Sequence, residues 1–189
     1  MHSKGIQFVR YADDFVCLVK PRDDATKLME LIPDFLNKKL GLKISADKST
    51  VTDFWKGFSF LGYKFKANRI MIREKSLSKF KDSIRSLTIR SYNSSNRNIR
   101  ELIKKKINPV VRGFANYFKL AECSNLFVRN LDCWVRMRLR AMKFKRISPL
   151  DNLRMRNKRF QKMELESLFE IFNLHNVKLK CNNILAPSQ

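Results

Sequence analysis

The stretch Phe8-Val9-Arg10-Tyr11-Ala12-Asp13-Asp14-Phe15 decides how the fold of this chain is interpreted. Apolar, β-prone runs at Phe8–Ala12 and Phe15–Val19 flank the two aspartates, a pattern that predicts a hairpin with both carboxylates at its tip. Adjacent carboxylates repel each other unless a cation lies between them. Two-metal phosphoryl transfer uses such groups to hold divalent ions about 3.5–4 Å apart. The alternative is a solvated turn, because Asp is a favoured turn residue.

The residues that follow this hairpin predict a mixed α and β region. Asp23 or Asp24 caps a predicted helix that Gly41 stops, and Pro33 should kink that helix or end it early. Further strand candidates follow at Leu42–Ser45, Ser49–Phe54, Phe58–Phe65 and Ile70–Ile72. The last two runs flank residues 66–69, which predicts a second hairpin.

From about residue 73 the apolar residues repeat at helical spacing. Ser76 is the predicted N-cap of a first helix, and Asn108-Pro109 should end a second helix and begin a third. A longer helix is predicted after Ser124, and Ser148-Pro149 should break the pattern. The sequence therefore predicts a change of architecture near residue 73.

The positive charge is concentrated in the same helical part. The chain of 189 residues carries 40 Lys and Arg against 17 Asp and Glu, a formal net charge of +23. Residues 73–189 account for +18 of it. Such a charge favours a polyanionic partner, nucleic acid first and an anionic membrane surface second. No apolar stretch approaches 18 residues and the cysteines lack metal-binding spacing, so neither a membrane span nor a zinc site is expected.

Four blocks resemble one protein family, in that family's order. Tyr11-Ala12-Asp13-Asp14 resembles the Tyr-Ala-Asp-Asp motif at the heart of the reverse transcriptase palm. The blocks 42–49 and 60–65 are similar to the next conserved palm segments. Residues 108–118 resemble the maturase, or X, domain of group II intron-encoded proteins. The resemblance spans about residues 8–146 and identifies the chain with the reverse transcriptase and maturase proteins of group II introns.

The resemblance implies an α+β fold: a partial polymerase palm of antiparallel hairpins and a helix, followed by an α-helical thumb and maturase domain. We expect the palm part in residues 1–72, the thumb and X domain in 73–150 and a basic helical extension in 151–189. Asp13 and Asp14 would then be catalytic carboxylates that hold a pair of Mg²⁺ ions, which suit carboxylate and phosphate oxygens. Lys48 would lie near the nucleotide phosphates, or be an ordinary exposed lysine.

The resemblance also implies contacts to the primer. Tyr11 would pack near the primer end and the incoming nucleotide. The block 60–63 would grip the primer strand, although its apolar residues could equally belong to a core; its members are Phe60, Leu61, Gly62 and Tyr63. A primer-template of RNA and DNA is the substrate that these roles imply.

The densest basic clusters are the candidate RNA-binding residues. They are Lys104, Lys105, Lys106, Arg112, Arg136, Arg138, Arg140, Lys143, Lys145 and Arg146. On a helix, Arg136, Arg140 and Lys143 share a face away from Leu131 and Leu139, so that one side could enter a core while the other follows phosphates. Structured RNA is recognised mainly by shape and backbone, which needs a broad basic surface.

In the family, a further palm aspartate and the fingers region precede the Tyr-Ala-Asp-Asp hairpin, but only seven residues precede Phe8 here. We therefore expect the C-terminal part of a reverse transcriptase, inactive as a polymerase alone, with an upstream half needed in trans. A truncated gene, a split gene and a partial record all remain open. So do three functions: a polymerase fragment, an RNA-binding splicing maturase without polymerisation, and a decayed remnant. The expected location is the cytoplasm, or an organelle in a eukaryotic host.

Overall fold

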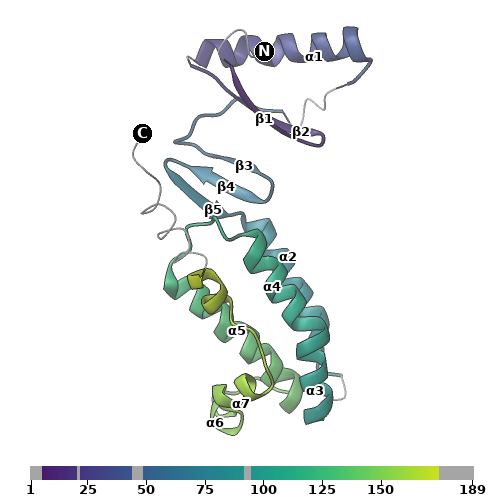
Figure 1. Ribbon diagram of the computed structural model, residues 1–189, viewed down its shortest axis with the longest axis vertical. Coiled ribbons are helices and arrows are strands. Elements are labelled where there is room, and N and C mark those ends of the chain that lie inside the picture. The colour runs from purple at the N-terminus through teal and green to yellow at the C-terminus, as the bar shows by residue number, and fades with distance from the viewer. Residues whose placement is uncertain (1–5, 21, 44–48, 92–94, 175–189) are drawn as a thin grey trace. The chain divides into compact units, whose positions relative to one another are not determined.

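A computed structural model describes residues 6–20, 22–43, 49–91 and 95–174 (Figure 1). The chain divides into two compact units, residues 1–69 and 70–189. Antiparallel strands and one helix make up the first unit, and helices dominate the second. The fold is therefore α+β, as the sequence predicted. No helix in the described ranges is long and apolar enough to cross a membrane.

The predicted first hairpin is confirmed. Strand β1 (Gln7–Tyr11) pairs antiparallel with β2 (Asp14–Leu18), and Tyr11 stands opposite Asp14. Ala12 turns the chain with a φ of 51°, the left-handed value that a tight two-residue hairpin turn of the primed type requires. This turn places Asp13 at the tip and Asp14 at the start of β2.

Helix α1 (Arg22–Leu40) continues through Pro33, so the early end that the sequence allowed does not occur. Its C-terminus lies where Gly41 predicted it. Gly41 has a φ of +63° and donates its N–H to Asn37 O at 3.0 Å, which is the left-handed glycine cap of a helix.

The strand predicted at Ser49–Phe54 is wrong. Residues 49–53 are irregular and Phe54 begins a turn. The reason is local, because Asp53 organises that turn: its Oδ1 accepts from Lys56 N at 2.7 Å, and its carbonyl accepts from Gly57 N at 2.9 Å. In the strand predicted at Leu42–Ser45, the first two residues are irregular and residues 44–48 lie outside the described ranges.

The hairpin predicted around residues 66–69 forms, and a further turn divides the run before it into two strands. Strands β3 (Phe58–Phe60), β4 (Tyr63–Lys66) and β5 (Arg69–Ile72) follow one another in a three-stranded sheet. Leu61 and Gly62 have φ values of 49° and 79°, so the predicted single run at 58–65 folds back on itself in a two-residue turn.

Helix α2 (Glu74–Leu87) begins before Ser76, so the predicted N-cap is wrong; Arg73 precedes the helix and makes no side-chain cap. Helix α3 (Asn96–Leu102), a π-helical segment (Ile103–Ile107) and α4 (Asn108–Tyr117) follow without interruption. Pro109 lacks an N–H and would clash with the carbonyl four residues earlier in a regular helix. The wider π turn comes immediately before it, so the chain stays helical where a break was predicted.

Helix α5 (Asn125–Phe144) begins as predicted, because Ser124 accepts from Phe127 N at 3.2 Å. Short helices α6 (Asp151–Arg154) and α7 (Asn157–Lys162) follow, and residues 168–174 are helical. Among the described residues, Ile32 is the one buried apolar side chain before Phe80. The core therefore lies in the second unit, and its most deeply buried apolar side chains include Ile84, Ile99, Ile103, Ile107, Leu139, Met142, Met155 and Leu168.

Candidate functional site

The tip of the β1–β2 hairpin presents both predicted catalytic carboxylates to solvent. Asp13 and Asp14 are exposed, and Tyr11 is 65% exposed beside them. Arg10 Nε donates to Ala12 O at 2.9 Å and so braces the turn from within. The geometry brings Tyr11, Asp13 and Asp14 together on one small turn.

This pair fits a divalent cation in donor chemistry, because carboxylate oxygens are the ligands that Mg²⁺ prefers. Within the described ranges no third Asp, Glu, His or Cys joins them in a cluster that could hold a metal. The tip thus offers two ligands of an octahedral shell and leaves the other positions to water, substrate or a further carboxylate.

The predicted primer-binding residues surround the β3–β4 turn. Phe60 pairs with Tyr63 across the ladder, and Leu61-Gly62 form the turn between them. All four residues are half-buried, and the Tyr63 ring contacts the Phe65 ring, which stacks on Phe58. Lys48 lies outside the described residues.

The three consecutive lysines lie on the π-helical segment and are exposed. Lys104 Nζ is 2.8 Å from Glu164 Oε1, and Lys105 Nζ is 2.5 Å from Glu101 Oε1. Hydrogen bonding to Glu101 raises the pKa of Lys105. The segment therefore presents positive charge that carboxylates of the same chain partly neutralise.

One of those carboxylates belongs to residues 163–167, which we call the acidic strap. Glu164 pairs with Arg100 at 2.6 Å as well as with Lys104. Asn108 fixes the strap from both sides, since its Nδ2 donates to Glu164 O at 2.7 Å and its Oδ1 accepts from Glu166 N at 3.1 Å. The strap thus holds acidic side chains against the basic helices α3 and α4.

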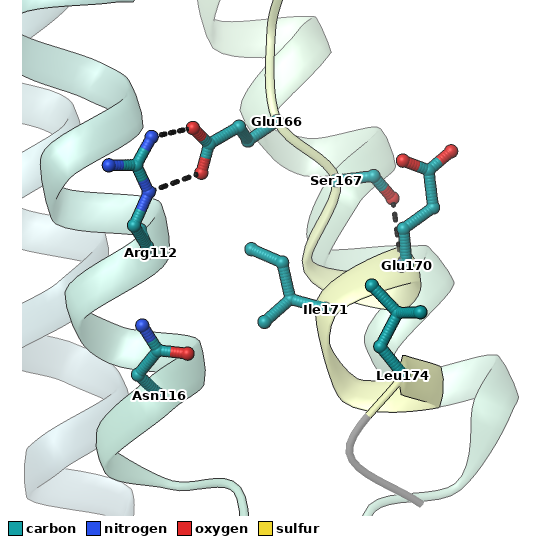
Figure 2. Close-up of a pocket in the computed structure, with 7 residues that line it drawn as sticks. All are labelled: Arg112, Asn116, Glu166, Ser167, Glu170, Ile171 and Leu174. Atoms are coloured by element: carbon teal, nitrogen blue, oxygen red, sulfur yellow. Dashed lines mark hydrogen bonds and ion pairs between the residues drawn. The ribbon is translucent and has the colours of Figure 1, made fainter. Parts of the chain in front are cut away.

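Arg112 is the predicted RNA-binding residue on α4, and the strap engages it too. It forms a two-fold hydrogen-bonded pair with Glu166, in which Nε donates to Oε2 at 3.1 Å (Figure 2). The pair borders an open hollow of about 390 Å³ between α4 and the helical residues 168–174. The hollow is lined by Arg112, Asn116, Glu166, Ser167, Glu170, Ile171 and Leu174.

The arginines of α5 do not form the solvent-facing side that helical spacing predicted. Arg140 is 8% exposed; it donates Nε to Met155 O and Nη2 to Asn157 Oδ1, both at 2.9 Å. Arg138 is half-buried and Arg136 donates to Cys133 Sγ at 3.2 Å. The reason is that the chain after α5 folds back over this face, so that Arg140 connects α5 to residues 155–157.

The end of α5 carries the remaining candidates. Lys143 is half-buried, and desolvation first and then the charge of Arg159 lower its pKa. Lys145 and Arg146 are exposed: Lys145 donates to Arg90 O, and Arg146 Nη2 donates to Asp151 Oδ1 at 3.3 Å. Asp151 is 1% exposed, and its Oδ2 finds no partner within the described ranges.

The sequence interpretation missed several polar residues whose roles depend on distant partners. Asp132, buried in α5, accepts from the backbone of Leu168 and Phe169 and from the Ser167 hydroxyl. Asn108 and Glu164 form the strap contacts described above. A polar residue at a core position of an apolar stripe is the signal that could have found Asp132 and Asn108.

Comparison with known proteins gives two family matches in succession along the chain. Residues 1–65 match the reverse transcriptase (RNA-dependent DNA polymerase) family, and residues 77–163 match the maturase-specific domain of group II introns. A putative COX1/OXI3 intron 2 protein of Saccharomyces cerevisiae is 39% identical over 64 residues, 33% of this chain. The group II intron-encoded protein LtrA of Lactococcus lactis subsp. cremoris is 34% identical over 68 residues, 35% of this chain. These matches span 8% and 11% of the two relatives' lengths.

Proposed function

Because the chain belongs to the family of group II intron-encoded reverse transcriptases and maturases, we propose that its helical unit binds intron RNA and that its hairpin contributes two carboxylates to a polymerase site. Two observations support the assignment of roles to the two units. The reverse transcriptase match, residues 1–65, covers the first hairpin, α1 and most of β3–β4, and the maturase match, residues 77–163, covers most of α2 and all of α3 to α7. The helices also carry most of the positive charge. We place this activity where the intron RNA resides, in the cytoplasm or in a eukaryotic host's organelle.

The observation that carries the RNA-binding proposal is that exposed cations stand on a well-packed helical core. Lys104, Lys105 and Lys106 are exposed while Ile103 and Ile107, at either end of the same segment, are fully buried. A packed scaffold fixes the backbone positions of these cations in advance, so that binding phosphates restricts only their side chains. Arg140 is buried and hydrogen-bonded, so it belongs to this scaffold. The proposed RNA-binding surface consists of the candidate cations that are exposed.

RNA binding is tested by titrating a labelled group II intron transcript with the 189-residue chain at several salt concentrations. We expect the logarithm of the association constant to fall by about 0.7–0.9 per tenfold rise in salt for each phosphate neutralised. The matched variant is K104Q/K105Q/K106Q, which should bind more weakly and with a shallower salt dependence. An affinity that does not change with salt would contradict the proposal.

For the hairpin, we propose that Asp13 and Asp14 would hold Mg²⁺ together with at least one carboxylate from another segment. The bound ions would supply charge stabilisation to phosphoryl transfer. Tyr11 beside them would support the primer end, and the turn at 60–63 would contact the primer strand. The exposed tip and the two-ligand donor set are what support this assignment.

The polymerase proposal is tested by primer extension on an RNA template with Mg²⁺. We expect no extension by the 189-residue chain alone, because within the described ranges no third metal-binding side chain joins Asp13 and Asp14, and two metal ions need more ligands than this pair supplies. Extension should appear when a polypeptide carrying the fingers and upstream palm of a related enzyme is added, and D13A/D14A should abolish it. Extension by the chain alone that exceeds the D13A/D14A background would overturn the expectation.

A splicing maturase without polymerisation is the second candidate. It is favoured by the position of the maturase match, 77–163, inside the unit that holds nearly all of the described core. A group II intron splicing assay separates the two functions. Faster splicing that D13A/D14A leaves unchanged would support the maturase function independently of the hairpin.

A further inference from the structure

Helices α2 and α5 pack against each other, and cations gather along their line of contact. Lys81 and Arg85 on α2 lie over the ring of Trp134 on α5, at 5.9 Å and 5.6 Å from its centroid. One helical turn further on, Arg138 of α5 reaches Thr88 at the end of α2. We call the group Lys81, Arg85, Arg90, Arg138 and Lys145 the cationic seam.

The seam is held in place by bonds to the end of α2. Arg138 donates Nε to Thr88 Oγ1 and Nη2 to Thr88 O, both at 3.1 Å. Thr88 is fully buried and donates its hydroxyl to Ile84 O at 2.6 Å. Lys145 donates to Arg90 O just beyond. These bonds therefore hold Arg138 and Lys145 in place before any ligand arrives.

The positive charge of the seam is only partly compensated. Arg85 pairs with Asp82 at 2.6 Å, whereas Lys81, Arg90 and Arg138 make no ion pair with a carboxylate in the part of the chain that the structure describes. Desolvation, followed by the nearby charges of Arg85 and Arg90, lowers the pKa of Arg138. Like charges held this close destabilise the fold unless an anion joins them.

A purely structural role accounts for only some of these residues. Arg138 satisfies the carbonyl of Thr88 at the C-terminus of α2, where cations are favourable in any helix, and Lys145 satisfies the carbonyl of Arg90 in the turn that follows. Arg85 and Arg90 are exposed and add charge that this capping does not need. A guanidinium group is planar and can donate to two phosphate oxygens at once. The two arginines therefore suit a phosphodiester better than a small spherical anion such as a halide.

We propose that the cationic seam between α2 and α5 is a binding site for the phosphodiester backbone of RNA, centred on Arg85, Arg90 and Arg138. This inference rests on the proposed RNA-binding function and adds a specific site to it. Lys81 and Arg85 frame Trp134 on one side of the site, and Lys145 borders it on the other. Arg85, Arg90 and Lys81 belong to none of the basic clusters that the sequence singled out.

The test compares two double variants of the full chain that lose the same charge. R85Q/R90Q removes two exposed arginines of the seam and leaves the Arg138–Thr88 bonds intact. K158Q/K162Q removes two exposed lysines of α7 and serves as the control. Fluorescence anisotropy with a labelled RNA hairpin gives the affinity, and circular dichroism verifies that both variants are folded.

We expect R85Q/R90Q to bind about tenfold more weakly, with a salt dependence reduced by about two phosphate contacts, and K158Q/K162Q to stay within about threefold of the wild type. R85K/R90K should recover part of the loss, because the charge returns without the planar fork. Equal losses in the two glutamine variants would overturn the seam while leaving RNA binding in place. No binding by the wild type would instead overturn the proposed function.

A second measurement does not depend on substituting the seam. In a W55F background Trp134 is the one tryptophan, so the tryptophan fluorescence reports on the seam alone. Iodide quenches this fluorescence, and because it is an anion, the cations of the seam attract it. Bound RNA should cover the seam and reduce the quenching constant severalfold at saturation. An unchanged quenching constant with saturating RNA hairpin would overturn the site.

Discussion

Asp132 is a buried carboxylate that fastens residues 168–174 to α5. Its oxygens accept from Ser167 Oγ at 2.6 Å, Leu168 N at 2.9 Å and Phe169 N at 3.1 Å. It therefore satisfies N–H groups in the first turn of a helix that begins more than thirty residues later, beside Ser167, whose Oγ accepts from Glu170 N at 3.4 Å. We expect D132A to lower the free energy of unfolding by about 2 kcal/mol, because the cap and its charge-assisted bonds are lost.

Urea denaturation followed by circular dichroism measures this change. The comparison is S167A, which removes one of the three donors to Asp132 together with the hydroxyl acceptor of Glu170 N, and which should cost about half as much. A D132A protein as stable as the wild type would show that the cap contributes nothing to the fold.

The cysteines differ in exposure, and their reactivity should follow. Burial raises the pKa of Cys123 to about 11, whereas Cys133 is exposed. At pH 8 only about a thousandth of Cys123 is thiolate, against about a tenth at the ordinary value, so its alkylation should be about 100-fold slower. Mass spectrometry after brief treatment with iodoacetamide should find the label on Cys133 before Cys123. Comparable labelling of both in the native state, as in the urea-unfolded control, would contradict this.

At the residue level, sequence reasoning succeeds where the determinant is local. The turn around Asp13, the cap at Ser124 and the helix stop at Gly41 depend on residues within a few positions. It fails at Arg140, because the partners that bury this side chain are 15 and 17 residues further along the chain. Helical spacing predicts which residues share a face, and it does not predict what covers that face.

At the level of elements, the acidic strap competes for the cations of α3, the π segment and α4. Glu164 binds both Arg100 and Lys104, and hydrogen bonds, first from Lys104 and then from Arg100, lower its pKa. These two cations therefore favour the ionised form of the carboxylate. A phosphate that approaches this surface must displace a negative charge already present.

We expect E164Q to bind the labelled RNA hairpin about two- to fivefold more tightly, on the scale of a single exposed charge pair. E122Q, with an exposed carboxylate between α4 and α5, is the control for the change of net charge. If both variants tighten binding equally, the strap has no specific competing role.

The π segment and the three-stranded sheet show where sequence reasoning about elements stops. Asn108-Pro109 predicts a break, but a hydrogen bond from Asn108 N to Ile103 O keeps the chain helical by widening one turn. The turn at Leu61-Gly62 divides an apolar run that alternation alone treats as one strand. In both cases a small backbone adjustment, which composition does not specify, replaces the expected boundary.

At the level of the whole molecule, the two units differ in how much core they hold. Of the described residues in 1–69, Ile32 is the one buried apolar side chain, and Phe8, Val9, Tyr11 and Phe15 are exposed on the hairpin. Local stability follows buried apolar contacts and protected backbone hydrogen bonds. We therefore expect amide hydrogens of β1, β2 and α1 to exchange much faster than those of α4 and α5.

Hydrogen exchange followed by mass spectrometry tests this directly on the full chain. Peptides from α5 should stay protected for hours while peptides from the first hairpin exchange within seconds to minutes. Equal protection in the two units would show that the first unit is stabilised by more than its own described side chains.

The strap and the Asp132 cap also determine when, during synthesis, the helical unit can be completed. A ribosome produces Asn108 and Asp132 well before residues 164–169, so on the nascent chain both groups wait for their partners. Polar groups that are buried without partners are costly, and the loosely packed intermediate exposes apolar surface. A translation product that stops before the strap should consequently be cleaved by cellular proteases faster than the full chain.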